Sequence, residues 1–160
     1  MKLSDFIEFE AIIPELSGGT RDECIGELVK SLADAGRIDK SKVKGLTRDL
    51  IKRESQGSTG IGKGIAVPHL KHSSIKEIVG TIGLCKAGLD FSSLDKAPVY
   101  SVVLLLSPTN DPDRHLETME NLFSHLQKDM FRKFLRQSET KKMVVDLILE
   151  ADEGHQDGNI

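Results

Sequence analysis

The segment from Gly57 to His69 holds the residues whose types and spacing are best suited to phosphate chemistry. Its glycines allow positive φ angles, so successive backbone N–H groups can turn toward one anion. Pro68 restricts the chain just before His69 and presents the imidazole at a defined place, as a candidate nucleophile. The N–H groups predicted to bind phosphate belong to Ser58, Thr59, Gly60 and Ile61.

Two further residues join His69 in the predicted catalytic set, namely Arg53 and His115. In phosphoryl transfer a neutral imidazole attacks phosphorus in line, and cations stabilise the equatorial oxygens. Arg53 lies at the end of the predicted helix that leads into the glycine loop, and Glu54 is interpreted as orienting Arg53 or a backbone amide. His115 lies in the first turn of a later helix, where it could bond a phosphate oxygen or orient His69.

Each of these two residues also has a simpler interpretation. Arg53 can be a solvated charge that complements the C-terminal dipole of its helix. His115 can be an exposed residue of a first helical turn. The sequence leaves both alternatives open.

A nucleotide-binding loop is the first rival interpretation of the glycine-rich segment. Gly57, four residues, Gly62 and Lys63 match G-x-x-x-x-G-K, but Gly64 stands where that motif needs Ser or Thr to hold magnesium. No buried strand precedes the segment, and its glycine spacing is not the G-x-G-x-x-G of a dinucleotide site. The pattern therefore predicts neither kind of nucleotide binding.

A metal-dependent hydrolase is the second rival. His69-x-x-His72 together with His115 and Asp111 supplies ligand types that zinc accepts. Catalytic zinc usually draws on tighter spacings within one rigid element. We expect neither a metal nor a cofactor.

The residues around His69 resemble a known family. Arg53-Glu54, Gly57-Ser58-Thr59-Gly60-Ile61-Gly62 and Gly64-Ile65-Ala66-Val67-Pro68-His69 are similar to the signature of enzyme IIA domains of the bacterial phosphotransferase system. The type is the fructose/mannitol one, whose free-standing members include the nitrogen-regulatory enzyme IIA. The resemblance covers residues 1–150. Leu70, Lys63 and His72 depart from the family pattern or have no role in it.

The resemblance implies a phosphohistidine carrier. His69 would accept a phosphoryl group from the carrier protein HPr or its nitrogen paralogue, and His115-Leu116 matches the family's second histidine. The acceptor or partner would be an enzyme IIB or a regulated target protein. The glycine loop and the start of the chain look most like nitrogen-regulatory members, and no IIB or membrane IIC segment is expected in the chain. Uptake of fructose or mannitol through an enzyme IIB is the alternative function.

Composition excludes several other classes of protein. The 160 residues carry a formal net charge of −3 with acidic and basic residues intermixed, so no basic block predicts nucleic-acid binding. The chain has no Trp and one Tyr, which leaves no stacking platform for bases. Cys24 and Cys85 lie in apolar patterns typical of buried thiols. Without a signal peptide or a long apolar run, we expect no membrane insertion and a cytoplasmic protein.

Apolar periodicity predicts alternating helices and strands. Thr20 opens a capping box before one helix, and Asp39 caps the next, which ends at Gly57. Residues 78–85 and the apolar run 99–106 read as strands, the second of them central and covered on both faces. Later helices are predicted from Asp111-Pro112, over 130–135 and around 143–148. The apolar side of the first of these carries Leu116, Met119, Leu122, Phe123 and Leu126.

These elements predict an α/β fold. We expect a single domain over residues 1–150, in which a mixed β-sheet is flanked by helices on both faces, as in type-2 enzyme IIA proteins. Residues 151–160 are expected to form a flexible tail.

Overall fold

A mixed β-sheet centred on one buried strand organises the molecule. The computed structural model describes residues 1–157, with side chains through residue 154. The central strand β5 (Val99–Ser107) pairs antiparallel with β4 (Val79–Leu89) on one side. On its other side β2 (Ile65–Ala66) and β3 (His69–Lys71) follow one another along the same edge, both parallel to β5. Strand β1 (Gly60–Gly62) pairs antiparallel with β2.

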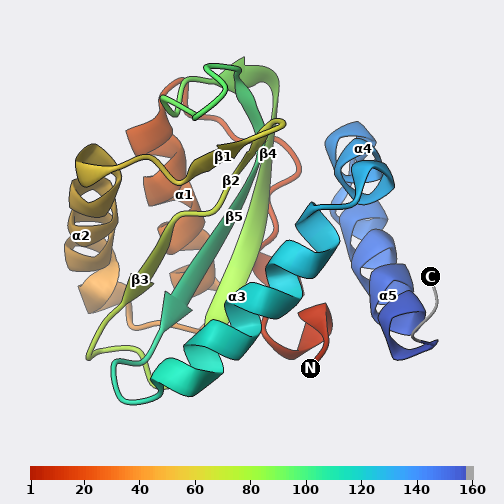
Figure 1. Ribbon diagram of the computed structural model, residues 1–160. Coiled ribbons are helices and arrows are strands. Elements are labelled where there is room, and N and C mark those ends of the chain that lie inside the picture. The colour runs from red at the N-terminus through yellow and green to blue at the C-terminus, as the bar shows by residue number, and fades with distance from the viewer. Residues whose placement is uncertain (158–160) are drawn as a thin grey trace.

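Helices cover both faces of this sheet (Figure 1). Helices α1 (Arg21–Asp34) and α2 (Val43–Gln56) pack on one face, and α3 (Pro112–Leu126), α4 (Asp129–Gln137) and α5 (Lys141–Asp157) lie on the other. Residues of β5 alternate between the two hydrophobic clusters, with Leu104 in the first and Leu105 in the second. The predicted α/β fold with a mixed sheet is confirmed.

Polar side chains start the helices where the sequence predicts caps. The Thr20 hydroxyl accepts from the Glu23 amide, and the Asp111 carboxylate accepts from the Arg114 amide at 3.2 Å. Asp39 caps a short 3-10 helix, Lys40–Lys42, that leads directly into α2. These bonds satisfy amides that have no partner within their own helices. None of the helices in the described part of the chain is long and apolar enough to cross a membrane.

Two features differ from the sequence expectation. Leu116 is 58% exposed, whereas the other four residues of the predicted apolar side of α3 are buried or pack against the core. The buried face of the helix also includes His115, Thr118 and Asn121. Helix α5 continues past residue 150, where we expected a tail, to Asp157. Its continuation has a physical reason, since Asp152 is buried and its carboxylate accepts from the amides of Leu3 at 2.7 Å and Ser4 at 3.2 Å. The last three residues of the expected tail lie outside the described residues.

We expect Asp152→Ala to lower the free energy of unfolding by about 3 kcal/mol or more, because two hydrogen bonds to a buried carboxylate are lost and each contributes about 1.5–3 kcal/mol. Urea unfolding followed by circular dichroism measures this change. Glu153→Ala, at the neighbouring exposed position, is the control and should change stability by less than about 0.5 kcal/mol. Equal effects of the two substitutions would show that the N-terminal segment is not held by Asp152.

Candidate functional site

His69 is the first residue of β3 and is held by the sheet. Strand β3 pairs with β5 in the register His69 to Leu105, and the Leu105 amide donates to the Pro68 carbonyl at 2.9 Å. The His69 Nδ1 atom lies 2.8 Å from the Val67 carbonyl oxygen. A carbonyl oxygen only accepts hydrogen bonds, so Nδ1 carries the proton and the lone pair is on Nε2. The half-buried ring therefore offers Nε2 as a nucleophile.

His115 lies beside His69, with the two ring centroids 5.9 Å apart. It is only 8% exposed, so its interpretation as an exposed first-turn residue is wrong. Its Nδ1 is 2.6 Å from the hydroxyl of Ser107, the buried last residue of β5. Burial, followed by the nearby Lys71 and His69, holds the pKa of His115 below its ordinary value of 6.5. The sheet and α3 thus bring a second, neutral imidazole next to His69.

The structure shows a role for Ser107 that we did not predict. Its hydroxyl fixes one nitrogen of His115 and so sets the orientation of that ring. The sequence contains a signal for it, because a single polar residue closes the apolar run of β5 just before a proline.

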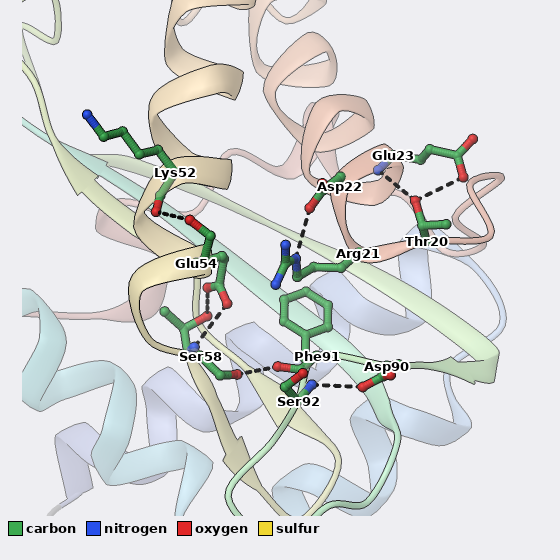
Figure 2. A network of polar contacts seen from close by, with 12 residues as sticks. Thr20, Arg21, Asp22, Glu23, Lys52, Glu54, Ser58, Asp90, Phe91 and Ser92 are labelled. Atoms are coloured by element: carbon green, nitrogen blue, oxygen red, sulfur yellow. Dashed lines mark hydrogen bonds and ion pairs between the residues drawn. The ribbon is translucent and has the colours of Figure 1, made fainter.

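Glu54 anchors the glycine-rich loop. This carboxylate is only 3% exposed at the end of α2, and it accepts from the Thr59 amide at 3.1 Å and from the Thr59 hydroxyl. Figure 2 shows Glu54 and, in the following loop, Ser58, whose hydroxyl donates to the Phe91 carbonyl. The Ser58 oxygen also accepts from the Gly60 amide at 2.9 Å. Glu54 therefore orients a backbone amide, one of the two roles expected for it.

These bonds occupy two of the four backbone amides that the sequence predicts to bind phosphate. The amides of Thr59 and Gly60 already have acceptors within the protein. A phosphoryl oxygen that binds either amide must share it with, or displace, an oxygen of Glu54 or Ser58. The side chain of Ile61, which completes the predicted set, is 40% exposed on β1.

Positive φ angles occur in the turn between β1 and β2 rather than at the start of the loop. Gly62, Lys63 and Gly64 have φ of 94°, 58° and 81°. A Cβ at Gly64 would lie 3.1 Å from the Tyr100 ring, so this position requires glycine on two grounds. The Lys63 amide donates to Asp95 at 2.9 Å, which stabilises the turn.

Arg53 lies at the entrance of the same loop. One guanidinium nitrogen donates to the Gly57 carbonyl just past α2, at 2.6 Å. This is the contact expected of a cation at a helix C-terminus. It uses one of the five N–H donors of the guanidinium and leaves the others for a ligand.

Of the four residues of the metal-site alternative, His69 and His115 lie side by side, but His72 and Asp111 do not complete a metal site with them. Among the side chains that the structure describes, no group of three or more His, Cys, Asp or Glu could hold a metal ion. His72 instead accepts at Nδ1 from the Ser74 amide at 3.0 Å, and Asp111 caps α3. The structure thus offers no support for the hydrolase interpretation.

Curated relatives include both nitrogen-regulatory and sugar-specific proteins. The chain is 31% identical over 153 residues to the PTS system fructose-specific EIIABC component of Bacillus subtilis, covering 95% of this chain and 24% of that protein. It thus spans about a quarter of that relative's length. It is 28% identical to a nitrogen regulatory protein of Bradyrhizobium diazoefficiens, covering 92% and 95% of the two chains.

Solved structures share the fold. The nitrogen regulatory protein IIA-Ntr from Neisseria meningitidis superposes with a TM-score of 0.81 at 24% identity, covering 91% of this chain and 98% of that one. IIA mannitol from Escherichia coli superposes with a TM-score of 0.72 at 19% identity, covering 88% and 97%.

The model of one protein family matches nearly the whole chain. Residues 5–151 match the family described as "Phosphoenolpyruvate-dependent sugar phosphotransferase system, EIIA 2". This range begins near the N-terminus and ends within α5, and it includes the glycine loop, His69 and His115. The chain therefore belongs to the EIIA type-2 family of the phosphoenolpyruvate-dependent sugar phosphotransferase system.

Proposed function

We propose that this protein is a cytoplasmic phosphocarrier that accepts a phosphoryl group on Nε2 of His69. The observation that carries the proposal is the bond from His69 Nδ1–H to the Val67 carbonyl, which leaves Nε2 with its lone pair in a ring that the sheet holds in place. The donor is the phosphohistidine of HPr or of its nitrogen paralogue. A new N–P bond forms at His69 as the donor's N–P bond breaks, and the donor imidazole leaves with the electron pair.

His115 is proposed to bind the transferred group rather than to orient His69. The Val67 carbonyl already orients the His69 ring, whereas His115 is neutral and lies beside it. We assign the Ser107 hydroxyl as the donor to Nδ1 of His115. This assignment places the proton of the neutral ring on Nε2, from which it donates to a phosphoryl oxygen. A hydrogen bond to a charged group contributes about 1.5–3 kcal/mol.

Arg53 and the backbone of Ser58 to Ile61 complete the proposed phosphate site. The guanidinium binds two oxygens with its planar fork, which an ammonium does not do. Glu54 holds the loop through Thr59, so its role is to position the amides rather than to contact the anion.

Incubation with phosphoenolpyruvate, enzyme I and HPr should add one phosphoryl group, stable in base and labile in acid, that peptide mapping places on His69. Intact-mass spectrometry follows the label over time. His69→Ala should take none. Arg53→Lys should take the label at a rate reduced by about tenfold or more, which corresponds to about 1.4 kcal/mol per tenfold. Label that persists in His69→Ala would refute the assignment.

We expect the pKa of His115 to lie below 6.5, and Lys71→Gln to raise it, because one of the positive charges that disfavour the imidazolium is removed. Since the folded state binds this proton less readily than the unfolded chain, the contribution of His115 to stability declines as the pH falls through 6.5. Phosphorylation of His69 should raise the pKa, because it places about −1.5 to −2 charges nearby. NMR titration of the ring protons measures all three pKa values, and an unchanged pKa in Lys71→Gln would contradict a contribution of the Lys71 charge.

We further propose that the protein acts mainly as a nitrogen-type regulator. Support comes from the matches to the nitrogen regulatory proteins of Bradyrhizobium diazoefficiens and, at 27% identity, of Pseudomonas aeruginosa, which cover 95% and 88% of those two proteins. The second candidate is transfer to an enzyme IIB for fructose or mannitol uptake. The fructose-specific relative of Bacillus subtilis favours it, and so does the fold shared with IIA mannitol in a complex with phosphorylated IIB, at a TM-score of 0.73.

A regulator should hold different partners in its two charge states, because the phosphoryl group changes the charge of the surface around His69. His69→Asp and His69→Ala should then retain different proteins from extracts of the source cells, as measured by quantitative mass spectrometry. A carrier instead loses its label rapidly to an added fructose or mannitol enzyme IIB. Fast, complete discharge together with identical partners for the two variants would overturn the regulatory assignment.

A further inference from the structure

A cationic groove lies between the β1–β2 turn, the end of β4 and helix α4. Its volume is about 890 Å³. The cationic side chains that line it come from three separate segments of the chain and are Lys63, Lys86, Arg132, Lys133 and Arg136. Two acidic residues, Asp129 and Glu139, lie at the same surface. The groove therefore has a surplus of three positive charges in a chain whose net charge is −3.

The two acidic residues are already paired. Asp129 bonds Arg132, and Glu139 accepts from Lys86 at 3.2 Å. These pairs account for two of the five cations. The remaining three, Lys63, Lys133 and Arg136, are exposed and carry the surplus.

Structure on either side of the groove preorganises these cations. The Arg136 guanidinium lies 3.5 Å from the centre of the Tyr100 ring, a cation–π contact that restrains it. Lys63 projects from a turn whose backbone is fixed by its bond to Asp95. Helix α4 is anchored by Phe131 and Leu135 in the core. Side chains that are already ordered lose less entropy when they bind.

The groove shares no lining residue with the proposed phosphoryl site, although Lys63 follows Ile61 by two positions. It contains none of the three proposed catalytic residues. His115 lies in the first turn of α3, whereas α4 begins after the other end of that helix, roughly 16 Å further along by helical rise. A partner that lies along α4 in the groove can therefore bind without contacting the three proposed catalytic residues.

We propose that this cationic groove docks an acidic segment of a partner protein, whose Asp and Glu carboxylates meet Lys63, Lys133 and Arg136. A short acidic segment interacts only with the three surplus positive charges of the groove, because charges more than about 8 Å away from it are screened at physiological ionic strength. A nucleic acid or an anionic membrane extends well beyond the groove and meets the excess negative charge of the rest of the chain. The affinity of a protein for DNA comes largely from the phosphates that its cations neutralise, about 6–10 in a strongly salt-dependent complex, and the groove provides only three unpaired cations. This inference goes beyond the proposed function, since no phosphoryl transfer is involved.

A fluorescein-labelled octaglutamate peptide tests the proposal by fluorescence anisotropy at an ionic strength of about 0.15 M, where charges further than about 8 Å are screened. Wild-type protein should bind it, and Lys63→Glu/Lys133→Glu should bind at least about tenfold more weakly. The matched control is Lys40→Glu/Lys44→Glu, which makes the same change in charge at two exposed lysines near the start of α2 and should weaken binding by less than about threefold. Thermal unfolding checks that both variants are folded.

The location and the class of ligand are tested in the same series. In amide NMR spectra, octaglutamate should shift the signals of Lys63 and Lys133, and a neutral octapeptide of Gln and Gly should shift neither. Equal losses in the two double variants would overturn the proposal, because binding would then depend on net charge alone. The absence of peptide binding would also overturn the proposal. The same holds if an oligothymidine or phosphatidylserine vesicles bind more tightly than octaglutamate and this binding is equally sensitive to Lys63→Glu/Lys133→Glu.

Discussion

The pairing of residues 65–71 with the central strand β5 is the constraint on which the site depends. Ile65 and Ala66 pair with Ser101 and Val102, and after the break at Pro68 the pairing resumes at His69 and Leu105. Proline has no N–H to give to a sheet, but its carbonyl accepts from the Leu105 amide, so the edge continues across it. Because β5 is buried on both faces, this register is not free to shift.

The same strand positions the second imidazole. Strand β5 ends at Ser107, whose hydroxyl bonds His115 after the chain has turned into α3. Strand β5 therefore positions both histidines. It holds His69 through backbone pairing and His115 through the side chain of Ser107. Positioning of this kind is most of what a protein contributes to phosphoryl transfer, since the transition state needs aligned atoms and stabilised oxygens rather than covalent help.

Charge is distributed unevenly around this frame. A buried carboxylate, Glu54, is compensated by a backbone amide and a hydroxyl rather than by a cation, so Arg53 remains available at the loop entrance. At the β1–β2 turn and along α4, the cations of the groove outnumber the acidic residues that pair with them. We propose that the surface at Arg53 binds a small, highly charged phosphoryl group and that the cationic groove binds a longer acidic segment.

Sequence by itself determined the family, the α/β class and most helix boundaries, and it singled out His69 as the candidate nucleophile. These depend on local patterns: caps such as Thr20, the apolar run of β5, and a glycine–proline–histidine order that is read directly from the chain. The tertiary structure decided what depends on residues distant in sequence. It showed that His115 is buried and bonded to Ser107, that α5 is extended because Asp152 holds the N-terminus, and that five cations from three segments form one groove. Sequence spacing does not encode such contacts, because the packing of the helices on the sheet sets which distant residues meet.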